Sequence, residues 1–145
     1  MILPILLLFI YASYSDIKTL EVPLWLSPAI ILLRFFSDEF FGNHDRIFLG
    51  IICGLVLFAI FFLISVIGQQ LGGADCLIVA AMGYVLDFYG FYAVIIGLLL
   101  SIPYTAYMKI TNTEHVYPLV PFLTSGFIIM LLMFSVQHNT ILWFI

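Results

Sequence analysis

The chain has 145 residues, of which 65% are apolar and 8% are charged, and it carries a formal net charge of −4. This length fits one domain, but so apolar a composition excludes an ordinary soluble protein and predicts that the bilayer is its solvent. The few charged residues form no basic cluster, which argues against nucleic acid or an anionic lipid surface as a partner.

The first apolar run extends from Ile2 to Tyr14 and is followed by Asp16. It lacks the positively charged start of a signal peptide, and its removal would discard or isolate the acidic segment, so we expect it to remain as a helix. Crossing the hydrocarbon takes roughly 20 residues. This shorter run therefore predicts that Asp16 lies close to the membrane surface. Pro23 is expected in the first turn of the next helix, Leu24 to Phe36, where its missing N–H costs nothing.

The polar stretch from Ser37 to Arg46 interrupts the apolar sequence. Its acids fit no ordered metal-binding loop, and we interpret the stretch as a solvated connection. The clearest membrane span follows, from Ile47 to Ile67. Gly50 and Gly54 lie four residues apart within it, a spacing that allows another helix to approach its backbone closely.

A fourth helix is predicted from about Asp75 to Phe88, and a fifth from Tyr92 to Met108. Asp87 lies at the opposite end of the fourth helix from Asp75, and we expect it in a solvated turn outside any site. The fifth helix has small residues at four-residue intervals, namely Ala93, Gly97, Ser101 and Thr105. They predict a face that packs against the third or fourth helix.

A polar loop at 109–116 leads to a sixth predicted helix from Pro118 to Val136, and we expect the remaining apolar tail to rest on the membrane. Cys53 and Cys76 lie within or beside apolar runs without the spacing of a zinc site, so we expect buried thiols and no bound metal. The predicted fold is all-α, a single membrane-embedded domain over residues 1–145 with about six transmembrane helices.

Six spans of alternating direction bring the ends of the odd helices and the starts of the even helices to one side of the membrane. Asp16, Asp75 and Pro118 all belong to that side, so we expect the two carboxylates to meet. Each aspartate alone is more typical of a helix end or cap. An ionised carboxylate loses hydration near hydrocarbon, however, which makes the pair a candidate for function. Two neighbouring carboxylates tend to share one proton, and such a pair can activate water and protonate a peptide carbonyl.

Three strings in the sequence carry recognisable motifs. The first contains Asp16, Lys18, Val22 and Pro23, the second Gly72, Asp75, Ala80 and Gly83, and the third Pro118 and Pro121. In this order they resemble the active-site motifs and the proline-rich start of the last helix in the type 4 prepilin peptidases, membrane aspartic proteases that cut leaders from pilin-like precursors. The sequence departs from the family pattern at Ala74, where the family has glycine, and at Leu77, where it has lysine.

The resemblance implies an aspartic endopeptidase whose catalytic residues are Asp16 and Asp75. The residues expected to shape the site are Gly72, Gly73, Ala74, Lys18, Pro23, Pro118 and Pro121. The resemblance also implies a substrate with a short charged leader joined to a hydrophobic helix, and cleavage without a cofactor at the cytoplasmic face of the cell membrane. The chain resembles the short form of the family, without the cysteine-bearing cytosolic domain. The identity of the precursor and the oligomeric state stay open.

Two other functions fit the same residues. A small proton or ion transport subunit would use the two acids as relay sites, although both lie at one surface and no acid in midmembrane continues a path. A non-catalytic scaffold of pilus or secretion machinery would bind a precursor and leave it uncut. Ion flux in proteoliposomes would favour the first alternative, and co-purification with an intact precursor would favour the second.

Overall fold

The computed structural model describes residues 2–42, 44–68, 72–110 and 118–138, and these residues form six α-helices. The helices are α1 (Ile2–Thr19), α2 (Leu26–Phe40), α3 (His44–Gly68), α4 (Gly73–Leu86), α5 (Tyr89–Ile110) and α6 (Val120–His138). The all-α prediction is confirmed. The predicted loop at 109–116 falls almost wholly outside the described residues, as do most of the turn before α4 and the end of the apolar tail.

Several of the helices are apolar enough for a bilayer. Three of them, α1, α3 and α5, are also long enough to cross it, and α4 and α6 contribute shorter apolar segments. At about 1.5 Å per residue, the 25 residues of α3 extend about 37 Å, more than the roughly 30 Å of hydrocarbon. Large apolar side chains are exposed along the outer faces of these helices. The chain is therefore a multi-pass membrane protein whose exposed apolar surface faces lipid.

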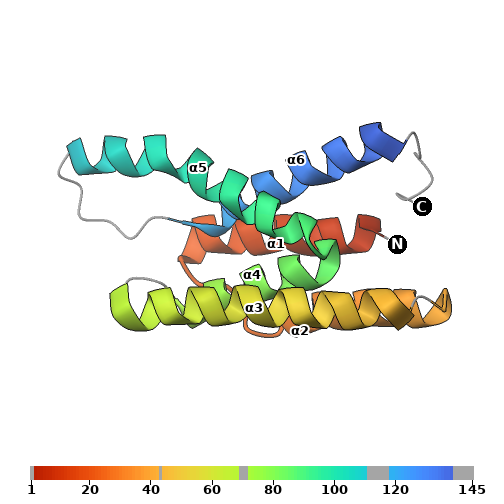
Figure 1. Cartoon of the computed structure of the whole chain (residues 1–145). Coiled ribbons are helices and arrows are strands. Elements are labelled where there is room, and N and C mark those ends of the chain that lie inside the picture. Colours follow the sequence, from red (N-terminus) through yellow and green to blue (C-terminus); the bar gives the residue numbers. More distant parts are fainter. Residues whose placement is uncertain (1, 43, 69–71, 111–117, 139–145) are drawn as a thin grey trace.

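Consecutive helices run in alternating directions (Figure 1). In that view α1, α3 and α5 end toward the left, and α4 and α6 begin on the same side. This is the arrangement that the alternating spans predict. It brings the end of α1 to the start of α6, and these two helices pack against each other.

Helix α4 lies at the centre of the bundle and packs against α2, α3, α5 and α6. A helix that is apolar on all sides needs such surroundings. Its buried residues are Cys76, Ile78, Val79, Ala81, Met82, Gly83, Tyr84 and Val85. The central position of α4 fixes the start of the helix, where Asp75 lies, against its neighbours.

Close backbone contact between α3 and α4 depends on glycine. A Cβ atom added at Gly50 would lie 2.8 Å from the Tyr84 carbonyl oxygen, and one at Gly54 would lie 3.0 Å from that of Ala80. On α4, a Cβ at Gly83 would lie 3.0 Å from the Cys53 carbonyl oxygen. The prediction that the two spaced glycines of α3 admit another helix is confirmed, and the buried state of both cysteines is confirmed as well.

The small-residue face of α5 packs against α6, so the prediction that it seats the third or fourth helix is wrong. A Cβ atom at Gly97 would lie 2.9 Å from the Leu123 Cα. A Cβ at Gly126 of α6 would overlap the carbonyl oxygen of Ala93. The physical reason is that α6 presents its own glycine to α5. Helix α5 meets α4 through Gly90, where an added Cβ would lie 3.0 Å from the Met82 carbonyl oxygen.

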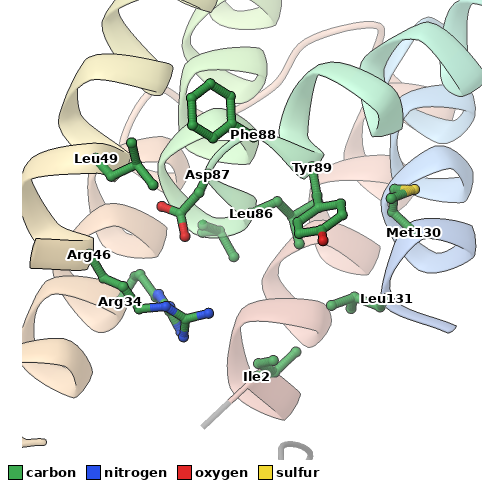
Figure 2. Close-up of a pocket in the computed structure, with 11 residues that line it drawn as sticks. Ile2, Arg34, Arg46, Leu49, Leu86, Asp87, Phe88, Tyr89, Met130 and Leu131 are labelled. Carbon is green, nitrogen blue, oxygen red and sulfur yellow. The ribbon is translucent and has the colours of Figure 1, made fainter. Parts of the chain in front are cut away.

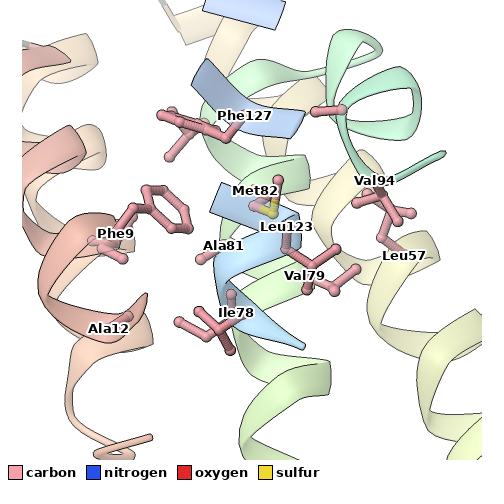
Figure 3. Packing of buried hydrophobic residues seen from close by; sticks show 14 of the residues in the cluster. Phe9, Ala12, Leu57, Ile78, Val79, Ala81, Met82, Val94, Leu123 and Phe127 are labelled. Carbon is pink, nitrogen blue, oxygen red and sulfur yellow. The ribbon is translucent and has the colours of Figure 1, made fainter. Parts of the chain in front are cut away.

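The core between α1, α4 and α6 is dense and aromatic (Figure 3). The rings of Phe9 and Phe127 have centroids 4.4 Å apart, and both side chains are fully buried. Ile78, Ala81 and Leu123 belong to the same buried cluster. This core holds the last turns of α1 against the start of α6.

Helix α1 continues through Asp16 instead of stopping before it. The Leu20 N–H donates to the Asp16 carbonyl oxygen at 3.0 Å, and Leu20 itself has a φ of +54°, which ends the helix. Pro23 was expected in the first turn of α2, and this was wrong. The helix begins at Leu26, whose N–H donates to the Pro23 carbonyl oxygen at 3.1 Å, so Pro23 belongs to the turn that precedes it.

The stretch after Phe36 is not the solvated connection that the sequence predicted. Helix α2 continues to Phe40, and Asp38 is buried because Arg34, one turn earlier, supplies an ion pair of 2.9 Å. Asp87 is not in a solvated turn either. It is half-buried, and burial raises the pKa of its carboxyl although the guanidinium groups of Arg46 and Arg34 act in the opposite direction.

Candidate active site

Asp16 lies in the last turn of α1 and is 5% exposed. Its Oδ2 accepts a hydrogen bond from the backbone N–H of Val120 at 2.9 Å, across 104 positions of sequence. The backbone of Leu119 lies close to this carboxylate as well. Asp16 therefore caps the start of α6 from a different helix.

The first turn of α6 supplies the backbone N–H groups that face Asp16. The first N–H groups of a helix have no partner within it, and they form the positive end of the helix dipole. The N–H groups of Phe122 and Leu123 donate to the Leu119 carbonyl oxygen at 3.1 and 3.2 Å and so close the first turn. Pro121 fits the second helical position because no intrahelical N–H is needed there, and Pro118 precedes the turn. The predicted proline-rich segment is thus the structural element that meets Asp16.

Asp75 is the third residue of α4 and is half-buried. Its Oδ2 accepts a hydrogen bond from the Gly72 N–H at 3.3 Å, which satisfies one donor at the helix start. A Cβ atom at Gly73 would meet nothing within 4 Å. Ala74 is the second residue of the helix and has a negative φ, so it fits without a left-handed conformation. Its methyl group packs against the core.

The structure brings the two predicted acids together. The negative charge of Asp16 acts on Asp75, although the two residues lie 59 positions apart in sequence. Helices α1 and α4 both contact α6, and Asp16 lies at the start of that helix. Two interacting carboxylates favour a state in which one is ionised and the other protonated.

Lys18 is not part of this constellation. It is exposed, and its ammonium group lies 5.9 Å from the centre of the Tyr14 ring, one turn back on α1. Asp16 is buried two residues earlier, and positions two apart on a helix do not share a face. Leu77, where the resembled family has lysine, is half-buried on α4.

Hydroxyl groups shape the connection from α1 to α2, and the sequence analysis did not identify them. The Ser15 Oγ donates to the Glu21 carbonyl oxygen at 3.0 Å, and the Thr19 Oγ1 lies 2.8 Å from the Ser15 carbonyl oxygen and 3.1 Å from that of Glu21. They hold the chain in a tight turn that leads to the buried Val22 and then Pro23. The available signal was a pair of hydroxyl residues at i and i+4 in the last turn of the first helix.

Thr124 is a second residue that sequence reasoning missed. It is buried, and its Oγ1 lies 2.8 Å from the Val120 carbonyl oxygen and 3.4 Å from that of Phe9. Thr124 thereby ties the first turn of α6 to α1. The available signal was a hydroxyl one turn inside an otherwise apolar helix, where it needs a backbone partner.

The described part of the chain holds no group of three or more His, Cys, Asp or Glu side chains placed to bind a metal ion. The groups around the two acids are instead backbone N–H donors, small residues and apolar side chains. The arrangement can hold and orient two carboxylates at one end of an apolar bundle.

A family model described as the type IV leader peptidase family matches residues 2–110. The match contains Asp16 and Asp75, and it ends before Pro118 and α6. No curated protein and no solved structure matches the chain significantly.

Proposed function

Because the chain belongs to the type IV leader peptidase family, we propose that it is a membrane aspartic endopeptidase that removes the leader from prepilin-like precursors. Asp16 and Asp75 are the proposed catalytic residues. The observation that carries the proposal is that the end of α1 and the start of α4 present interacting carboxylates, one of which accepts a hydrogen bond from the start of α6. Family membership supports the reaction class, and this pair of acids supports the mechanism.

The proposed reaction uses one proton shared between the two acids. The ionised carboxylate takes a proton from water as the water oxygen bonds to the scissile carbonyl carbon. The protonated carboxyl group donates its proton to the carbonyl oxygen. Collapse of the resulting tetrahedral intermediate breaks the C–N bond. The leaving amine receives the proton that the first carboxylate took from water, and a hydroxyl group of the intermediate returns a proton to the second. The apparent acid constants of such a pair belong to the pair and not to either residue.

The proposed substrate has a short charged leader joined to an apolar helix. The apolar helix would lie in lipid along the exposed apolar faces of the bundle, and the leader would stay in water beside the carboxylates. Cleavage then takes place at the membrane surface, which we assign to the cytoplasmic face of the cell membrane. Within this site, Gly72, Ala74 and Pro118 shape the ends of the helices that carry or contact the acids.

The direct test is a cleavage assay with the full chain in liposomes and a prepilin precursor as substrate. Mass spectrometry should find the precursor shortened by its leader, with the cut between the charged segment and the apolar helix. If several precursors stay intact over a range of pH while one of them co-purifies with the chain, the protein is a scaffold and the proposal is wrong.

The role of the α6 helix start in orienting Asp16 gives a second test. Val120→Pro removes the N–H that donates to the Asp16 Oδ2, and proline is favoured at the first position of a helix. A hydrogen bond to a charged group contributes about 1.5–3 kcal/mol, so we expect kcat to fall by about 10- to 100-fold with KM nearly unchanged. Steady-state cleavage kinetics measure both constants.

Val120→Ala is the matched control because it shortens the same side chain and keeps the N–H. It should retain kcat close to that of the original chain. Equal losses in Val120→Ala and Val120→Pro would mean that the valine side chain matters and the backbone donor does not, which contradicts this role.

A further inference from the structure

A second group of charged side chains lies at the end of the bundle opposite Asp16. Arg34 and Asp38 come from α2, Arg46 from the first turn of α3, and Asp87 from the corner between α4 and α5. Ile2, at the other end of α1 from Asp16, lines the same region. The proposed peptidase reaction uses none of these charged groups.

The charged group borders a cavity of about 240 Å³. The cavity is lined by Ile2, Arg34, Arg46, Leu49, Val85, Leu86, Asp87, Phe88, Tyr89, Met130 and Leu131. Figure 2 shows Arg34, Arg46 and Asp87 on one side of it, and Ile2, Met130 and Leu131 on the other. The cavity therefore has a polar side and an apolar side, which suits an amphiphile.

The charges on the polar side balance one another. Arg34 is 7% exposed, and its Nε lies 2.9 Å from the Asp38 Oδ2. Arg46 and Arg34 both act electrostatically on Asp87. The two cations and two anions sum to zero, so a purely anionic ligand gains little net attraction. A ligand that carries both a phosphate and a positive group matches both signs.

Two further observations indicate that this region is arranged for a ligand. The Tyr84 hydroxyl, which lies close enough to Arg34, Asp38 and Asp87 to interact electrostatically with them, is buried and makes no hydrogen bond within the described residues. Asp87 has φ 54° and ψ −130°, a conformation close to those that only glycine adopts easily. Strain of this kind concentrates at functional sites.

We propose that this cavity binds the headgroup of a phospholipid that carries a primary ammonium group, such as phosphatidylethanolamine. The phosphate lies against the guanidinium groups of Arg34 and Arg46, which suit its geometry. The ammonium group lies against the Asp87 carboxylate, and an acyl chain extends over Ile2 and Met130. The lipid comes from the leaflet opposite the carboxylate pair, and the inference is independent of the proposed peptidase activity.

Native mass spectrometry of the full chain, released from membranes with equal amounts of three phospholipids, tests the proposal. The three headgroups are phosphoethanolamine, phosphocholine and phosphoglycerol. We expect the ethanolamine lipid to be retained at least about tenfold more than either of the others. A quaternary ammonium cannot donate hydrogen bonds to Asp87, and phosphoglycerol lacks a positive group. Soluble glycerophosphoethanolamine, which lacks acyl chains, should compete only weakly.

Asp87→Asn removes the negative charge and keeps a residue that tolerates a positive φ, so the corner should still fold. This variant should lose the preference for ethanolamine over choline. Asp45→Asn is the matched control because it makes the same change at an exposed position of the first turn of α3, outside the cavity. It should keep the preference.

Equal retention of the three lipids would overturn the proposal. Preference for phosphoglycerol would also overturn it, because the site would then recognise anionic charge alone. Retention of the ethanolamine preference in Asp87→Asn would remove the assigned role of that carboxylate. Strong competition by the soluble headgroup would show that the apolar side of the cavity does not hold an acyl chain.

Discussion

Asp16→Asn and Asp75→Asn should each reduce cleavage of a prepilin precursor by about 10²- to 10⁴-fold, the range expected when a general acid or base is removed. Each asparagine keeps the shape of the side chain and an oxygen that can accept the existing backbone hydrogen bond. The helix starts that these residues cap should therefore remain folded. Single-turnover cleavage followed by mass spectrometry measures the loss.

The double variant gives a sharper result. The effects of substituting two residues that act as one unit do not add, so the double variant should lose no more activity than the less active single variant. Asp45→Asn, an exposed acid outside the pair, should cleave at the original rate. A single variant of Asp16 or Asp75 that cleaves at the original rate, with the expected product, would end the paired-acid mechanism.

Gly126→Ala should destabilise the protein by about 1–3 kcal/mol or more, because that range is typical of overpacked cores. Alanine favours a helix over glycine by about 1 kcal/mol, so the substitution would stabilise an isolated α6. In the bundle, however, the new methyl group overlaps the Ala93 carbonyl oxygen and lies 2.8 Å from the Gly97 nitrogen. Both are backbone atoms, which cannot rotate away as a flexible side chain would. The steric cost should therefore exceed the helical gain, and thermal unfolding in detergent measures the net effect.

Ser125→Ala is the control on the same helix. The Ser125 Oγ donates to the Phe122 carbonyl oxygen within α6, and its loss should change stability by less than about 0.5 kcal/mol. An unfolding temperature of Gly126→Ala at or above that of the original chain would show that α5 and α6 do not cross as closely as described. Gly126→Ala should also lower cleavage of the precursor, because α6 carries the backbone N–H that donates to Asp16.

The sequence was sufficient to predict the helices and the meeting of the two acids. Long apolar runs separated by polar or glycine-rich segments fix the number of helices, and alternation of direction then brings Asp16 near Asp75. The close approach of α3 and α4 also followed from local spacing, because Gly50 and Gly54 belong to one run of sequence. These features depend on composition and on order along the chain.

The remaining features depend on which distant surfaces meet. Nothing near Asp16 in sequence indicates that the Val120 N–H will be its donor, and the small face of α5 fits any helix that offers a glycine of its own. The polar stretch after Phe36 has the composition of a solvated loop. Asp38 is nevertheless buried, because Arg34 compensates its charge within the helix. Such pairings are decided by the complete packing arrangement.

The contact between Asp16 and Val120 also sets an order for biosynthesis. The acid is made 104 residues before the backbone group that holds it. At about 5–20 residues per second, a ribosome needs roughly 5–20 s to make that stretch. During this time α1 can already insert into the membrane, but the Asp16 carboxylate still lacks its hydrogen-bond donor from α6. A nascent chain arrested before α6 would therefore contain both acids without the donor that orients Asp16, so we expect full activity only after α6 has been made.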